Sequence, residues 1–181
     1  MSRAVSAWRD KRSIVINERA YRGVSVVDRG VFTARGGKDC ETYAGQITDG
    51  FACGLGVLAF PGSKTYAEYG PDGKSDGRYL DRAANGFTGY ILFERGARKQ
   101  QAWVWADGEC YYNDEDCARN DPRVLALIAH VGPVEALANA AAKEAVEAVA
   151  STLAGGFTWR LAIACEALRG HFQTLECLKA T

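Results

Sequence analysis

Hydrophobic and polar positions alternate in short segments over roughly the first 110 residues of the chain. The clearest β-prone runs, at 24–27, 56–60, 90–93 and 102–106, are separated by Asp-Gly, Asn-Gly or Arg-Gly pairs. Such pairs suit the two-residue turns of hairpins. The pattern therefore predicts a chain of antiparallel β-hairpins.

From Asp121 onward the apolar positions follow a helical period instead. Asp121 and Pro122 have the residue types of a helix cap and a first helical position, which predicts a helix as far as about Val131. A Gly-Pro pair ends this helix and begins a second one, rich in alanine, over 133–154.

Two further helices are expected near the ends of the chain, at 2–12 and at about 157–178. The second has an apolar seam of residues three or four apart: Leu161, Cys165, Leu168, Phe172 and Leu175. This seam either pairs across a two-fold axis in a homodimer or packs on Ala138, Ala141 and Ala145. Small residues facing large ones favour the intramolecular packing.

An aromatic-x-Gly unit recurs in the strand-forming part at intervals of 21 to 23 residues. The units begin at Tyr21, Tyr43, Tyr66 and Phe87, although Glu68 replaces the glycine of the third. Residues i and i+2 of a strand share a face, so each ring is expected to lie beside its own glycine. A glycine leaves room for a ring from its own strand or a neighbour to lie on the backbone.

The unit 43–57 reproduces the pattern Tyr-x-Gly-x4-Gly-x3-Gly-x-Gly of the MORN (membrane occupation and recognition nexus) repeat at every glycine. The copy that follows keeps the aromatic and two glycines. Over 43–79 the chain thus resembles MORN-repeat proteins, and diverged copies extend the resemblance to 21–112. The resemblance implies one elongated antiparallel sheet, often capped by a helix. Such repeats serve as protein-interaction modules, lipid-associated modules or appendages to enzymes.

Together these patterns predict an α+β chain, with an antiparallel β-meander of eight to ten strands followed by three helices that cover the end or one face of the sheet. Its segments would be an N-terminal stretch (1–20), the repeat sheet (21–112), an acidic connector (113–120) and a helical segment (121–181).

Charge and composition limit the classes of partner that the protein is expected to bind. The 181 residues include 22 Lys plus Arg and 22 Asp plus Glu, so the net charge is zero and no overall field attracts nucleic acid or anionic lipid. No direct binding of nucleic acid or membrane is expected. The most apolar stretch, 153–168, contains Arg160 and Glu166, which predicts a soluble protein.

The six cysteines include no Cys-x-x-Cys pair, and the first residues lack the apolar core of a secretory signal. These features predict reduced thiols and a cytoplasmic location.

Residues suited to catalysis or metal binding are sparse. Neither His130 nor His171 has a ligand partner three or four residues away. Cys110 and Cys117 are the closest cysteines, but no second pair completes a zinc site, so they are expected to be separate, small buried residues. We therefore assign no catalytic residue, metal or cofactor, and we expect a protein that is not an enzyme.

Large aromatic and acidic residues gather between 103 and 116. They are Trp103, Trp105, Tyr111, Tyr112, Asp114, Glu115 and Asp116. The aromatic residues, of which Trp103 and Trp105 share a strand face, form either the core between sheet and helices or a binding surface. The acidic run is either a solvated connector or a docking patch for a basic partner, such as a nucleic-acid-binding protein.

The expected function is non-enzymatic protein binding, by a small bacterial or phage protein that inhibits or regulates a larger assembly. Two alternatives stay open. One is an enzyme with a cleft between sheet and helices that uses His130 or a cysteine. The other is a structural homodimer formed through the C-terminal helix.

Overall fold

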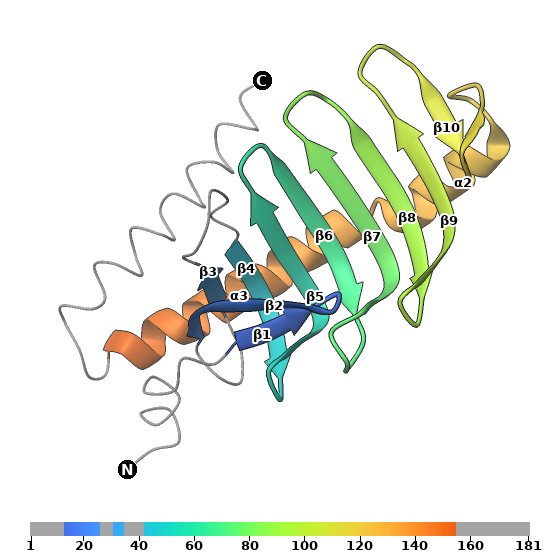
Figure 1. The fold of residues 1–181 in the computed structure, drawn as a ribbon. Helices are drawn as coiled ribbons and strands as arrows, with labels where there is room; N and C mark the ends of the chain where they lie inside the picture. Colours follow the sequence, from blue (N-terminus) through green and yellow to red (C-terminus); the bar gives the residue numbers. More distant parts are fainter. Residues whose placement is uncertain (1–12, 26–30, 35–41, 155–181) are drawn as a thin grey trace.

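In the part of the chain that the structure describes, eleven strands form one sheet in which each strand pairs with the next (Figure 1). The computed structural model describes residues 13–25, 31–34 and 42–154. The strands are β1 (Ser13–Ile16), β2 (Arg19–Ser25), β3 (Val31–Ala34), β4 (Thr42–Thr48), β5 (Phe51–Phe60), β6 (Ser63–Tyr69), β7 (Ser75–Ala83), β8 (Thr88–Glu94), β9 (Ala97–Val104), β10 (Cys110–Tyr112) and β11 (Glu115–Asp116). The predicted α+β chain with an antiparallel β-meander ahead of its helices is confirmed.

The sheet has more strands than the eight to ten expected. The additional strands lie at its two ends, because β1 falls within the segment 1–20 and β11 within the acidic connector 113–120. Their hairpins turn at Asn17-Glu18 and Asn113-Asp114, where all four residues have positive φ. Neither turn contains the glycine that marks the other hairpins.

Two central hairpins have the turn chemistry that the sequence predicts. In the β4–β5 turn, Asp49 and Gly50 have φ of 52° and 85°, and in the β8–β9 turn Arg95 and Gly96 have φ of 51° and 79°. Positive φ at both central residues matches the twist of the flanking strands. These local turns set the register of the meander.

Glycines beneath aromatic rings occur as expected. The Tyr43 ring lies over Gly45 of its own strand and Gly56 of β5, where an added Cβ would stand 2.5 Å from the Tyr43 hydroxyl oxygen. That hydroxyl donates a hydrogen bond to the Gln46 carbonyl at 3.0 Å. Gly89 is covered by Trp103 from the neighbouring strand β9, so the ring over an aromatic-x-Gly unit can come from either strand.

Two helices, α2 (Pro122–Val131) and α3 (Val134–Ala154), run along one face of the sheet (Figure 1). They confirm the helices expected at 121–131 and 133–154. Asp121 caps α2, since its side chain accepts a hydrogen bond from the Arg123 amide at 2.8 Å. The helices expected at 2–12 and 157–178 lie outside the described residues, and so do Leu161, Leu168, Phe172 and Leu175.

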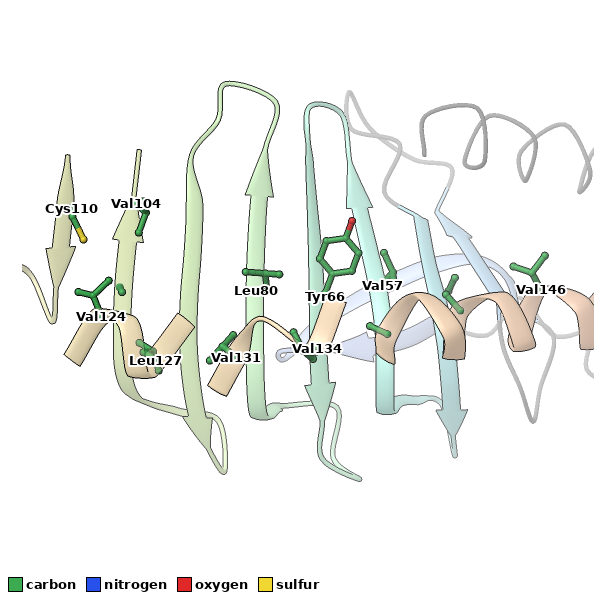
Figure 2. Packing of buried hydrophobic residues seen from close by; sticks show 14 residues of the cluster. Val57, Tyr66, Leu80, Val104, Cys110, Val124, Leu127, Val131, Val134 and Val146 are labelled. Carbon is green, nitrogen blue, oxygen red and sulfur yellow. The ribbon is translucent and has the colours of Figure 1, made fainter. Parts of the chain in front are cut away.

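The layer between helices and sheet is a continuous apolar core (Figure 2). The buried residues labelled there are Val57, Tyr66, Leu80, Val104, Cys110, Val124, Leu127, Val131, Val134 and Val146. Ala138, one of the three alanines proposed to receive the apolar seam, belongs to the same cluster and packs on the sheet. We call the covered side of the sheet the helix face and the opposite side the open face.

The first hairpin covers part of the open face. Ile14 and Ile16 are each 1% exposed and join a second apolar cluster with Tyr43 and Leu58. Val15 pairs with Phe51 in a parallel bridge, which ties β1 to β5. The remaining open face, over β8 to β10, is free of this hairpin (Figure 1).

The helical stretch Pro122–Ala148 is long and apolar enough by composition to cross a membrane, with a mean hydropathy of 1.5 over its most apolar window. Gly132 and Pro133 interrupt the stretch, and one side of it packs on the sheet in the apolar core. A helix covering the core of a soluble protein has the same character.

Candidate protein-binding surface

The alternation of side chains along β9 decides where the aromatic residues lie. Ala102 and Val104 belong to the core on the helix face, so Trp103 between them points to the open face. Tyr111 is the cross-strand partner of Trp103, whereas Tyr112 pairs with Ala102 and packs on the helix-face core. Trp103 and Tyr111 are therefore not part of the core between sheet and helices, and that interpretation is wrong for them. It is correct for Tyr112.

Four rings form a continuous row on the open face. Phe87 stacks on Trp103 with ring centroids 5.3 Å apart and an interplanar angle of 21°. Trp105 meets Phe87 edge-on at 4.8 Å and Tyr111 at 5.4 Å. All four side chains are half-buried, so each ring is supported by its neighbours and still reaches solvent.

Acidic residues lie near Tyr111 at the end of this row. The pKa of Tyr111 is raised chiefly by the charge of Asp116, its cross-strand partner on β11, and further by Glu109 and Asp107. Asp107 also accepts a hydrogen bond from the Glu109 amide at 3.1 Å, which orders the turn before β10. We call this set, Phe87, Trp103, Trp105, Tyr111, Asp107, Glu109 and Asp116, the aromatic–acidic patch.

The side chains of the acidic run 113–116 do not all lie on the same face of the sheet. Asp114 accepts a hydrogen bond from the Gln101 side chain at 2.6 Å, and Glu115 lies opposite Tyr112 on the strand pair. Only Asp116 joins the patch, because successive strand residues point to opposite faces. The docking role expected of Asp114, Glu115 and Asp116 stays a prediction, with Glu115 and Asp116 on opposite faces of β11.

Tyr112 has a different partner on the helix face. The guanidinium of Arg123 lies over its ring, 4.9 Å from the centroid. This contact links β10 to the first turn of α2 and so has a structural role.

One further carboxylate lies on the open face near the row of rings. Asp81 pairs with Gly89, the residue that Trp103 covers, and accepts a hydrogen bond from the Thr65 hydroxyl at 2.5 Å. Burial raises the pKa of Asp81. Its register places it in the same cross-strand row as Trp103 and Tyr111.

Sequence reasoning missed four residues of this region: Phe87, Asp81, Asp107 and Glu109. Asp107 and Glu109 lie between Trp105 and Tyr111 in the sequence, and this proximity could have indicated them. Phe87 and Asp81 come from other strands, so only the register brings them together.

The enzyme alternative requires a cleft between sheet and helices. Apolar side chains fill the layer between helices and sheet, and His130 is exposed on α2. Among the described residues no group of three or more His, Cys, Asp or Glu side chains could hold a metal ion.

The two nearest cysteines are not separate, contrary to expectation. The sulfur atoms of Cys110 and Cys117 lie 3.5 Å apart. The hairpin β10–β11, which the sequence did not predict, brings them together.

The chain matches no protein-family model, and no curated protein is significantly similar to it in sequence.

Proposed function

We propose that this protein is a non-enzymatic binding module that docks on a basic protein segment and thereby inhibits or regulates a larger assembly in the cytoplasm. The observation that supports the proposal is the aromatic–acidic patch, a row of half-buried rings that the helices leave uncovered. We interpret the hairpins of 21–112 as MORN-like repeats. Such repeats would supply a rigid sheet for this surface.

The chemistry of the patch favours a cationic partner. Arginine and lysine side chains bind over the faces of Trp and Tyr rings, and each such contact contributes about 0.5–2 kcal/mol. Asp107, Glu109 and Asp116 add charge complementarity around Tyr111. The same carboxylates repel phosphate, which favours a basic protein, for example one that binds nucleic acid, over nucleic acid itself.

The rings have the character of binding hot spots. Trp, Tyr and Arg dominate such sites, and their truncation to alanine costs about 2 kcal/mol or more, which corresponds to about 30-fold in affinity. Since the protein has no net charge, attraction of a basic segment depends on this local patch.

The test uses three variants of the tagged full chain. Trp105→Ala and Tyr111→Ala remove rings of the patch, and Leu137→Ala, a residue 41% exposed on α3, is the matched control on the opposite side. We expect an oligo-arginine peptide to quench tryptophan fluorescence of the protein and of the control but to bind the patch variants at least tenfold more weakly. An oligo-glutamate peptide should not bind.

Capture from a native lysate extends this test to a natural partner. A basic protein retained by the wild type and by Leu137→Ala, but lost with Trp105→Ala, supports the proposal. If the patch variants retain every captured protein and bind oligo-arginine as the wild type does, the proposal is wrong.

A further inference from the structure

The last hairpin of the sheet brings two thiols into contact. Tyr111 pairs with Asp116 and Tyr112 with Glu115 in the β10–β11 ladder, so Cys110 and Cys117 stand opposite each other one step further along. The Cys117 amide donates a hydrogen bond to the Cys110 carbonyl at 3.0 Å, and the sulfur atoms are 3.5 Å apart.

This geometry suits a cross-strand disulfide. Directly opposed residues of an antiparallel pair have Cα atoms about 4.5–5.5 Å apart, and disulfides span Cα separations of about 4.4–6.8 Å. A change of side-chain rotamer is enough to close the sulfur atoms to bonding distance, because the backbone bond already holds the two strands together. The β10–β11 turn at Asn113-Asp114 need not move.

The two cysteines differ in access to solvent. Cys110 is 4% exposed, within the apolar core on the helix face, whereas Cys117 is half-buried. Burial, followed by the neighbouring thiol of Cys117, raises the pKa of Cys110 to about 11. An oxidant in solution therefore meets Cys117 first, and Cys110 is placed to react with the product.

We propose that Cys110 and Cys117 form a reversible regulatory disulfide, made by a peroxide and broken by cellular thiols. The Cys117 sulfur attacks one oxygen of hydrogen peroxide, which breaks the O–O bond, releases water and leaves a sulfenic acid. The Cys110 sulfur then displaces the hydroxyl group, which takes up the Cys110 proton and leaves as a second water. Two thiols lose two electrons and two protons, and one peroxide becomes two waters.

The disulfide lies outside the aromatic–acidic patch but constrains the hairpin that contributes residues to the patch. It closes a ring that contains Tyr111 and Asp116, so it fixes the hairpin that carries the acidic end of the patch. β10 and β11 have three and two residues, and such short terminal strands open more readily than the central ones. Oxidation is expected to suppress that opening.

The first experiment detects the bond in the full chain. Trypsin releases both cysteines in one peptide, 100–119, because no lysine or arginine lies between Lys99 and Arg119. After hydrogen peroxide treatment and alkylation of free thiols, we expect this peptide to be lighter by two hydrogen atoms and to carry no alkyl group. Dithiothreitol should restore both alkylation sites.

Two variants provide the controls. Cys117→Ser should abolish the cross-linked peptide, and Cys53→Ser, which removes a half-buried cysteine of β5, should leave it unchanged. A wild-type peptide that is alkylated at both cysteines after peroxide, or that carries sulfinic acids instead of the bond, overturns the proposal.

Hydrogen exchange tests whether the disulfide suppresses opening of the β10–β11 hairpin. The amide of Cys117 is expected to exchange several-fold more slowly in the oxidised protein than in the reduced one, with amides of β5 and β6 unchanged. Equal exchange rates in the two forms would show that the bond does not stabilise the hairpin and would overturn its regulatory role. Because neither measurement uses a binding partner, failure here leaves the proposed binding function standing.

Discussion

Two partly buried carboxylates of the sheet have pKa values shifted in opposite directions. Burial raises the pKa of Glu68, but hydrogen bonds and the charge of Arg78 outweigh burial, so the pKa lies below its ordinary value of 4.5. The Arg78 Nε atom lies 3.1 Å from one Glu68 oxygen, and both side chains are about one quarter exposed. Asp81 has only the Thr65 hydroxyl against its burial, and its pKa lies above 3.8. Neighbouring charge rather than burial alone decides the direction.

These shifts predict opposite pH dependences for two isosteric variants. A lowered pKa in the folded state contributes stability that is present above pH 4.5 and is lost as the pH falls through the folded pKa. Glu68→Gln should thus be less stable than the wild type by about 1 kcal/mol at pH 7, and the difference should shrink toward pH 3. For Asp81 the raised pKa gives stability that is complete below pH 3.8 and is lost as the pH rises. The advantage of the wild type over Asp81→Asn should therefore diminish between pH 3 and pH 7.

Urea denaturation at pH 3, 5 and 7 measures both differences. The two variants serve as controls for each other, since each replaces one carboxylate by an amide of the same shape. Parallel pH dependences for Glu68→Gln and Asp81→Asn would contradict the assignment of opposite shifts.

At the scale of strands, glycine and aromatic residues act as pairs across the ladder. A Cβ added at Gly89 would overlap the Cζ3 atom of Trp103, whose ring also stacks on Phe87. Because the backbone of Gly89 has no positive φ, the cost of a side chain there is steric. The glycine is therefore required by the ring and not by a turn.

We predict that Gly89→Ala lowers the free energy of unfolding by about 2 kcal/mol, because the indole must leave its place over the strand. In a Trp103→Ala background the same substitution should cost at least 1 kcal/mol less, roughly the coupling found for residues in contact. Equal costs in the two backgrounds, measured by urea denaturation, would show that Trp103 is not what excludes a side chain at Gly89.

The sequence predicted those elements whose signals are local. Turns such as Asp49-Gly50 and the cap at Asp121 combine residue type and position within a few residues, and these two formed as expected. The turns Asn17-Glu18 and Asn113-Asp114 adopt the same left-handed backbone without glycine, since asparagine tolerates it. Both were overlooked, and the hairpins β1–β2 and β10–β11 with them.

The candidate site was predictable only in part. Alternation along β9 placed Trp103 and Trp105 on one face, but which face the helices cover depends on the path of the chain after β11. The contributions of Phe87 and Asp116 depend on the register of separate strands. The contact between Cys110 and Cys117 required a hairpin that the sequence did not indicate.

At the scale of the whole molecule, each face of the sheet has its own cover. Helices α2 and α3 extend along one face, and the first hairpin covers the open face near β4 to β6 (Figure 1). The hairpin is held by Asn17, whose side-chain oxygen accepts hydrogen bonds from the Ser75 amide at 2.7 Å and the Ser75 hydroxyl at 3.0 Å. The Asn17 amide in turn donates to the Gly73 carbonyl at 2.8 Å. A turn near the beginning of the chain thus fastens strands that follow more than fifty residues later.

Substitutions of Asn17 and Glu18 should distinguish the stabilisation by the hydrogen bonds to Ser75 from the cost of the left-handed backbone. Asn17→Gly keeps the left-handed backbone but loses both side-chain bonds, so we expect a loss of about 1–2 kcal/mol in the free energy of unfolding. Asn17→Ala should lose about 1 kcal/mol more, because alanine is strained at a φ of 48°.

Glu18→Gly is the matched control. It relieves strain at a φ of 66° and loses only an exposed ion pair with Lys74, so stability should rise or stay constant. Thermal and urea denaturation rank the three variants. If Asn17→Gly proves as stable as Glu18→Gly, the bonds to Ser75 do not hold the hairpin on the sheet, and the apolar contacts of Ile14 and Ile16 alone must do so.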